Sequence, residues 1–446
     1  MPNLMPVTED RQTLASRLDD ARSKTDEIFS ILTPEALYDR PIPERHRLVF
    51  YLGHVEAFDW NLIARRTFEL DSFHPEFDKL FAFGIDPIDG GLPNEPASDW
   101  PEARAVRSYN ERVRNTVDEC LKGAHKPRAG ADLETIFNMA IEHRLMHAET
   151  LAYLIHQLPI ASKIIPAGEE AAPRQPGRRA AMGPPRMIRI PSGIATLGRA
   201  LEEHRFGWDN EFGRMSVHVP DFSIEAQKIS NGRFLDFVRE GGYENQKYWS
   251  DADWAWKRRE GIRYPHYWRE QDGEWTYCGM FAEVPLPLDA PVYVSHAEAA
   301  AFARWEGRSL PTEAQFHRAA YGTPDGGERE YPWGEDPPSR AHGNFDLRLW
   351  DPTPIGAHPR GDSAFGVSEL VGNGWEWTSS VFGPFPGFRP HPLYEGYSAN
   401  FFDGEHFVQK GGSPRTAACM LRRSFRNWFQ PHYPYVYAGF RLVAEV

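Results

Sequence analysis

The stretch Glu142-His143-Arg144-Leu145-Met146-His147-Ala148-Glu149 lies inside a long amphipathic run from Asp132 to Gln157, which predicts a helix. Residues four positions apart share one face of a helix, so His143 and His147 project side by side. Two imidazoles one turn apart can bind a single metal ion such as iron, zinc, copper or nickel. Two histidines leave a metal under-coordinated, so a third ligand would come from elsewhere in the chain. The alternative interpretation is a pair of ordinary surface or core histidines.

The residues before this stretch predict three more helices. Apolar residues recur at helical spacing over Thr8–Ser30 and Arg45–Phe68, and a third helix begins at Pro101, with Ser98 or Asp99 as its cap, and ends near Gly123. With the helix that Asp132 caps, they predict a four-helix bundle over residues 8–159.

The second of these helices carries His54 among apolar residues. This histidine is either a hydrogen-bonded core residue or the third metal ligand, because facing helices of a bundle often assemble metal sites in its core. The connection from His74 to Trp100 is long and rich in Gly, Pro and Asp. Connections of this length are often functional.

The second half of the chain differs from the first in composition and in the secondary structure that it predicts. Residues 160–186 are rich in Pro, Ala, Gly and Arg and predict a linker. Beyond it, over residues 187–446, strands are expected at Met187–Ile190, Ala195–Leu197 and Ser216–Ile224. Ser230, Ser295 and Thr312 are expected to cap helices, which span Asn231–Glu240, Ala297–Trp305 and Glu313–Tyr321. Residues from Tyr331 onward are expected to be mostly irregular and aromatic, and the whole chain is predicted to be α+β.

Composition narrows the class of protein. The 446 residues carry a formal net charge of -13 without a basic cluster, which argues against a nucleic-acid partner. The three cysteines do not form a disulfide framework. No apolar run reaches membrane-spanning length, and the N-terminus lacks an apolar signal core. A soluble cytoplasmic enzyme that acts on small molecules is therefore expected.

The second half resembles the formylglycine-generating-enzyme (sulfatase-modifying factor) domain, a variant of the C-type lectin fold. The matching motifs occur in the family's order: Ile229–Phe234, Pro291–Ser295, Gly307–Phe316, Tyr331–Gly334, Gly372–Thr378, Gly411–Ser413 and Gly439–Arg441. Formylglycine formation uses a pair of cysteines near the C-terminus, and here only Cys419 lies in that region. The resemblance therefore implies the fold without that activity.

The first half resembles a DinB-type four-helix bundle, and the two halves together resemble the ergothioneine-synthase (sulfoxide synthase) family. These are mononuclear non-haem Fe(II) enzymes that use O2 to join a chalcogen to C2 of the imidazole of hercynine. The resemblance implies that His54, His143 and His147 bind the iron. A substrate cleft between two independently folded halves is expected, and a structural calcium ion in the second half is left open.

The resemblance also implies roles for residues outside the metal site. Asn427 matches a position that contacts hercynine, and Trp428 and Phe429 are expected to line the substrate site, with ordinary core residues as the alternative. The catalytic tyrosine of the family falls in a segment that contains Tyr394 and Tyr397. Glu149 either orients a ligand imidazole as an acceptor or is a solvated helix residue. Three arginines are expected to be structural: Arg422, Arg423 and Arg426.

Three departures from the family pattern concern residues that hold the substrates. Met146 stands where the family has a glutamine that helps to hold hercynine, and Phe429 stands where it often has aspartate. The loop Gly84–Glu95 contains no Arg or Lys to pair with the carboxylates of a peptide thiol. An uncharged donor fits better, which indicates a selenoneine synthase that joins hercynine to a selenosugar. The alternatives are an ergothioneine-type enzyme with a thiol donor and a non-catalytic, lectin-like binding protein.

Overall fold

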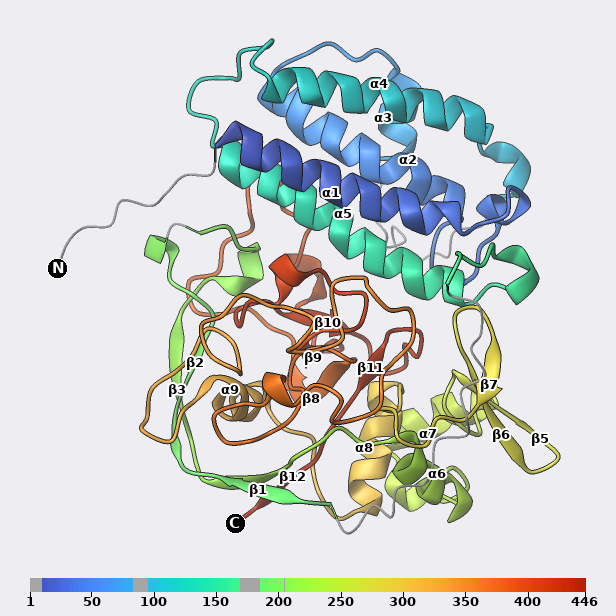
Figure 1. Cartoon of the computed structure of the whole chain (residues 1–446), viewed down its shortest axis with the longest axis vertical. Helices are drawn as coiled ribbons and strands as arrows, with labels where there is room; N and C mark the ends of the chain where they lie inside the picture. Colours follow the sequence, from blue (N-terminus) through green and yellow to red (C-terminus); the bar gives the residue numbers. More distant parts are fainter. Residues whose placement is uncertain (1–9, 83–94, 169–184, 204) are drawn as a thin grey trace. The chain divides into compact units, whose positions relative to one another are not determined.

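The computed structural model describes residues 10–82, 95–168, 185–203 and 205–446. They form two compact units, shown in Figure 1. The first unit comprises Met1–Glu170 with His204–Phe206, and the second comprises Ala171–Glu203 with Gly207–Val446. No helix among the described residues is long and apolar enough to cross a membrane.

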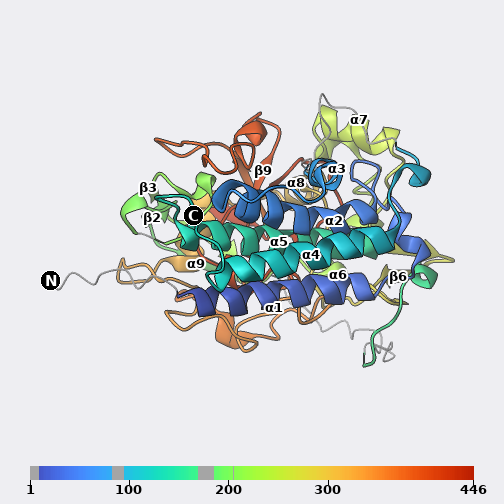
Figure 2. The ribbon, with the colours of Figure 1, turned by 90° about the horizontal axis from the view of Figure 1, so that it is seen from above.

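The first unit is a bundle of four long helices that lie side by side (Figure 2). They are α1 (Arg11–Ser30), α2 (Leu48–Asp59), α4 (Ala103–Leu121) and α5 (Leu133–His156). Helix α1 packs on α5, and α2 packs on both α4 and α5. The predicted four-helix bundle is confirmed, and the pair α2 and α5 carries all three predicted metal ligands.

Helix ends follow from caps and local backbone bonding. Asp10 caps α1 by accepting a hydrogen bond from the amide of Thr13 at 2.8 Å, and Asp132 caps α5 as predicted, by accepting from the amide of Thr135 at 3.2 Å. The second predicted helix, Arg45–Phe68, is shorter and not uniform. It begins at Leu48 and continues after Asp59 as a π-helical segment, Trp60–Thr67, in which the amide of Phe68 bonds to the carbonyl of Ile63.

The predicted connection from His74 to Trp100 is not entirely a loop. It contains helix α3 (Pro75–Leu80), which starts with Pro at the first helical position after His74. The next helix begins later than predicted, at Ala103, with Glu102 rather than Ser98 or Asp99 at the cap position. Of the segment 84–95, whose lack of Arg and Lys is the sequence argument for an uncharged donor, only Glu95 lies within the described residues.

The second unit is built from small sheets with helices against them. Its four-stranded sheet has the order β10-β9-β8-β11, a three-stranded sheet has the order β1-β4-β12, β2 pairs with β3, and β5-β6-β7 form a meander. A buried cluster that includes Ile190, Phe222 and Phe316 packs helix α9 against the sheets. The strands are β1 (Met187–Ile190), β2 (Gly193–Leu197), β3 (Met215–Val219), β4 (Phe222–Glu225), β5 (Trp268–Gln271), β6 (Glu274–Cys278), β7 (Glu283–Pro285), β8 (Trp375–Val381), β9 (Phe407–Lys410), β10 (Asn427–Phe429), β11 (Ala438–Gly439) and β12 (Val443–Glu445).

Helix caps in this unit were predicted more accurately than strands. Ser230, Ser295 and Thr312 cap α6 (Asn231–Arg239), α8 (His296–Trp305) and α9 (Glu313–Tyr321). The single predicted strand Ser216–Ile224 is wrong, because Pro220 and Asp221 separate β3 from β4. Three parts of this unit were not predicted: helix α7 (Asp251–Arg259), the β5–β7 meander and the sheet formed after Tyr331. These segments are short, and long-range contacts rather than local periodicity fix their structure.

Candidate metal centre

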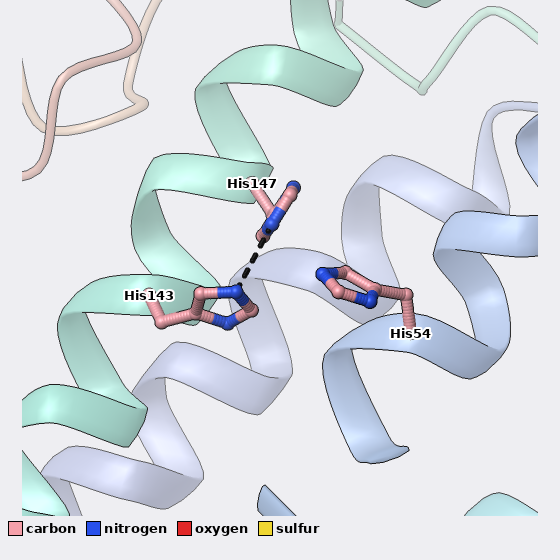
Figure 3. A group of neighbouring side chains, drawn as sticks. All are labelled: His54, His143 and His147. Atoms are coloured by element: carbon pink, nitrogen blue, oxygen red, sulfur yellow. Dashed lines mark hydrogen bonds between the residues drawn. The ribbon is translucent and has the colours of Figure 1, made fainter. Parts of the chain in front are cut away.

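Helices α2 and α5 bring three histidines to one point in the core of the first unit (Figure 3). One ring nitrogen from each of His54, His143 and His147 lies within 4.8 Å of the other two. All three side chains are buried, with 2–3% of their surface exposed. Among the described residues, no other group of three or more His, Cys, Asp or Glu side chains is close enough to hold a metal ion.

The backbone fixes which nitrogen of His54 faces the other two rings. Its Nδ1 lies 2.7 Å from the carbonyl oxygen of Phe81. A carbonyl can only accept, so Nδ1 carries the proton and Nε2 carries the lone pair. That Nε2 is buried and has no hydrogen-bond partner among the described residues. A metal ligand held in this way by a backbone carbonyl is typical of protein metal sites.

The spacing of His143 and His147 fits a shared metal. Their Nε2 atoms are 3.2 Å apart. Two nitrogens bound to one metal at about 2.1 Å lie roughly 3.0–3.4 Å apart for bond angles between octahedral and tetrahedral values. The pair therefore already has the separation that adjacent ligands require.

The protonation state of the three rings favours metal binding. Burial lowers the pKa of His54 to about 4. Burial also lowers the pKa values of His143 and His147 well below the ordinary value, and neighbouring imidazoles lower them further. All three are therefore neutral at pH 7, the form that donates a lone pair to a metal.

A buried ionic cluster next to the histidines joins the same two helices. Arg144 donates to Glu56 at 2.8 Å and to Asp59 at 2.6 Å, and none of these three side chains is exposed. Arg114 of α4 reaches the same Glu56 at 2.7 Å. Burial alone would raise the pKa of Glu56, but the two arginines hold it at about 2. Sequence reasoning overlooked this cluster, although charged residues on two largely apolar helices were its signal.

Aromatic rings surround the histidines. Phe58 stacks on His143 with ring centroids 3.5 Å apart, and Phe50 stacks on His54 at 4.9 Å.

On α5, Met146 and Glu149 are half-buried. The roles predicted for them, substrate binding for Met146 and orientation of an imidazole for Glu149, stay predictions.

In the second unit, the predicted substrate residues Asn427, Trp428 and Phe429 form strand β10 and are half-buried. Asn427 donates to the side-chain oxygen of Gln409 at 3.1 Å. Trp428 stacks on Phe382 at 4.2 Å. These residues are thus ordered by the sheet and by ring packing, and their proposed contact with substrate stays a prediction.

The two candidate tyrosines lie in one turn. Tyr397 is buried, stacks on Trp208 with centroids 4.0 Å apart, and meets Trp428 edge-on at 5.5 Å. Tyr394 is half-buried, 5.8 Å from Tyr397. The structure therefore brings Tyr397 directly to the predicted substrate strand.

The three arginines expected to be structural each pair with a carboxylate. Their partners are Glu211 for Arg422, Glu328 for Arg423 and Glu313 for Arg426. A structural calcium ion in the second unit, which the sequence leaves open, stays a hypothesis.

Comparison with known proteins covers both units. Residues 17–151 match the family model of the DinB superfamily, and residues 172–446 match that of the sulfatase-modifying factor enzyme 1-like domain. The chain is 32% identical over 447 residues to a hercynine oxygenase of Mycolicibacterium thermoresistibile, a match that covers 98% of this chain and 95% of that protein. A hercynine oxygenase of Mycobacterium tuberculosis is 35% identical over 77% of this chain and 78% of its own length.

A longer relative matches most of this chain. The ergothioneine biosynthesis protein 1 of Neurospora crassa is 29% identical over 93% of this chain, which matches 56% of that protein. The bundle with its three histidines, the sheet-rich second unit and these matches along nearly the whole chain agree. This chain belongs to the family of hercynine oxygenases and ergothioneine biosynthesis proteins, in which a DinB-type region is followed by a sulfatase-modifying factor domain.

Proposed function

We propose that this chain is an iron- and oxygen-dependent enzyme that joins a sulfur donor to C2 of the imidazole ring of hercynine. The observation that carries the proposal is the cluster of His54, His143 and His147, whose spacing, burial and neutral rings fit a metal ion. The names of its relatives support hercynine as the substrate.

The three histidines would hold the iron. Three neutral imidazoles do not cancel the charge of Fe(II), and they leave coordination positions open. When bound, the iron supplies the oxygen chemistry of the reaction. The carbonyl of Phe81 and the Arg144 cluster fix the positions of the histidine rings. The aromatic rings packed around the histidines limit the access of water.

Strand β10 would supply the binding surface for hercynine. The indole ring of Trp428 offers an aromatic face, and attraction between a trimethylammonium and such a face is worth ~0.5–2 kcal/mol. The amide of Asn427 offers a hydrogen-bonding group for the carboxylate or ring of the substrate. Tyr397, edge-on to Trp428, is the better placed of the two tyrosines to act on a bound substrate.

The atoms of the proposed reaction balance. The C2–H bond of hercynine and the S–H bond of the thiol break, and a C–S bond forms. One oxygen atom of O2 ends on the sulfur as a sulfoxide, and the other leaves with the two hydrogens as water. O2 is thus the four-electron oxidant, and no other reductant is needed.

The first experiment tests the metal and the substrate together. Protein loaded anaerobically with Fe(II) is mixed with hercynine, O2 and a thiol such as γ-glutamylcysteine or cysteine, and products are identified by mass spectrometry. We expect the coupled sulfoxide from the wild type. We expect none from His54→Ala, His143→Ala or His147→Ala, each of which should also retain less iron. Turnover at the wild-type rate without iron or O2 would reject the proposal.

A selenosugar is a second candidate donor, and Phe429 favours it. A peptide thiol brings carboxylates that need cationic partners, and a buried unpaired carboxylate costs several kcal/mol. Phe429 offers no charge, and the loop Gly84–Glu95 has no Arg or Lys. Sugar hydroxyls can instead bind amides, backbone and water. The reaction is then the same with Se–H in place of S–H.

The two candidates are separated by competition. Wild-type enzyme is given hercynine with γ-glutamylcysteine, a thiosugar and a selenosugar, and kcat/KM is measured for each. A preference of tenfold or more for the selenosugar over both sulfur donors would assign C–Se bond formation. A comparable or higher kcat/KM for the peptide thiol would assign the ergothioneine-type reaction.

A further inference from the structure

Four consecutive residues of the second unit, Trp208–Glu211, are almost fully buried. Trp208 is followed by a short 3-10 helix, Asp209–Glu211, in which the exposed fractions are 3%, 1% and 0%. The four residues together are called the Trp208–Glu211 turn. Carboxylates are rarely buried unless they are paired. The partners of Asp209 and Glu211 lie about 190 and 210 residues further along the chain, so this turn joins segments that are remote in sequence.

Asp209 and Trp208 hold the segment that contains the two candidate tyrosines. The Oδ1 atom of Asp209 accepts a hydrogen bond from the hydroxyl of Ser398 at 2.6 Å. The adjacent Tyr397 stacks on Trp208 with centroids 4.0 Å apart and ring planes 21° from parallel. Two neighbouring residues of the turn therefore hold two neighbouring residues of the tyrosine segment, one by a hydrogen bond and one by ring stacking.

Glu211 holds a second segment, which leads into strand β10. Its carboxylate accepts from Nε of Arg422 at 2.8 Å, contacts a second nitrogen of that guanidinium, and accepts from the hydroxyl of Ser424 at 2.7 Å. A bidentate arginine contact with an added hydroxyl bond fixes direction as well as distance. Asn427 follows three residues after Ser424.

The two segments meet at Trp428. The ring of Tyr397 lies edge-on to Trp428 with centroids 5.5 Å apart. The separation between a candidate catalytic tyrosine and the candidate hercynine surface is therefore set by one turn that holds both.

We propose that the Trp208–Glu211 turn is a positioning element for the reaction, in which Asp209 sets the place of Tyr397 and Glu211 sets the place of strand β10. The inference rests on the proposed function, because the roles of Tyr397 and β10 come from it. None of the four residues of the turn needs to touch substrate. They act through the residues that they hold.

Three serines allow a matched test. Ser398, Ser424 and Ser295 are buried, and each hydroxyl donates to a buried carboxylate, at 2.6 Å to Asp209, 2.7 Å to Glu211 and 2.7 Å to Glu298. Ser295 caps helix α8 and has no link to the turn. Ser398→Ala, Ser424→Ala and Ser295→Ala therefore make the same chemical change. If these hydroxyls only stabilised the fold, all three variants would have a lower melting temperature, and their kcat and KM values would not differ from one another.

The expected kinetics differ between the three variants. Ser398→Ala frees the tyrosine segment, so kcat should fall at least tenfold while the KM for hercynine changes less than twofold. Ser424→Ala loosens the approach to β10, so the KM for hercynine should rise at least fivefold with a smaller change in kcat. Ser295→Ala should keep both within twofold of wild type. Iron content should be unchanged in all three, since the three histidines lie in the other unit.

Two outcomes overturn the inference. One is wild-type kcat in Ser398→Ala, and the other is equal kinetic losses in all three variants. If the wild type forms no product from hercynine with any donor, the proposed function fails instead. The turn is then measured by near-UV circular dichroism, in which Ser398→Ala alone should lose the signal of the stacked Tyr397 and Trp208. An unchanged spectrum would reject the positioning role.

Discussion

At the scale of single residues, one hydrogen bond decides which nitrogen of His54 is available to a metal. The carbonyl of Phe81 takes the Nδ1 proton, so the lone pair on Nε2 faces the other two imidazoles. Phe81 is itself held against α2 at Gly53, where an added Cβ would lie 2.6 Å from three atoms of the Phe81 ring. The absence of a side chain at Gly53 therefore helps to set the orientation of His54 in the candidate metal site.

Gly53→Ala should weaken iron binding although alanine favours a helix more than glycine does. The methyl group would displace the Phe81 ring and with it the carbonyl that orients His54, so we expect a 10- to 100-fold higher Kd for Fe(II). The measurement is anaerobic titration with Fe(II). Gly383→Ala is the control, because an added Cβ there meets nothing within 4 Å. Unchanged affinity in Gly53→Ala would show that the Phe81 carbonyl does not orient the ligand.

At the scale of elements, helices α2 and α5 are joined beside the candidate metal site by buried ion pairs as well as by apolar packing. The buried guanidinium of Arg144 joins Glu56 and Asp59 of α2, two and five residues beyond His54. A buried ion pair contributes little net stability compared with apolar residues, but removal of one partner is costly. The cluster thus sets the register of the two helices that carry the three candidate ligands.

Arg144→Met should destabilise the first unit strongly, because two buried carboxylates lose their main cation. We expect a loss of about 3–5 kcal/mol in the free energy of unfolding, measured by urea denaturation followed by far-UV circular dichroism, and weaker iron binding in the folded variant. Arg40→Met removes an ion pair whose partner Glu95 is half exposed and should cost less than about 1 kcal/mol. Equal losses in the two variants would contradict a special role for the cluster.

The elements also show what could be predicted from the sequence. The i, i+4 spacing of His143 and His147 and the caps Asp132, Ser295 and Thr312 are local features, and the structure places them as expected. His54 was assigned as a ligand through family resemblance, since nothing local separates it from a core histidine. The bond from His54 to Phe81 joins residues 27 positions apart, and strand β10 exists only because β9 lies beside it. Such contacts depend on tertiary packing, which the periodicity of the sequence does not predict.

At the scale of the whole molecule, both units bury neutral histidines. Burial lowers the pKa of His54 in the first unit to about 4, and it does the same for His266 and His296 in the second. In the unfolded chain these rings titrate near 6.5. The unfolded state therefore binds more protons between pH 6.5 and 4, and stability must fall as the pH falls through that range. Above pH 6.5 this contribution to stability is fully present.

The second unit offers the cleaner measurement of this effect, because it holds all of the 14 tryptophans except Trp60 and Trp100. Urea unfolding followed by tryptophan fluorescence should show a lower midpoint at pH 5 than at pH 7. A shift from 6.5 to about 4 corresponds to a loss on the order of 3 kcal/mol for each such ring by pH 4. His296→Gln removes one of these rings and should flatten the dependence on pH, whereas replacement of the exposed His218 by Gln should not. If the midpoint stays constant from pH 7 to 5, these rings gain a proton while the unit stays folded. Solvent would then reach the rings more easily than their burial implies.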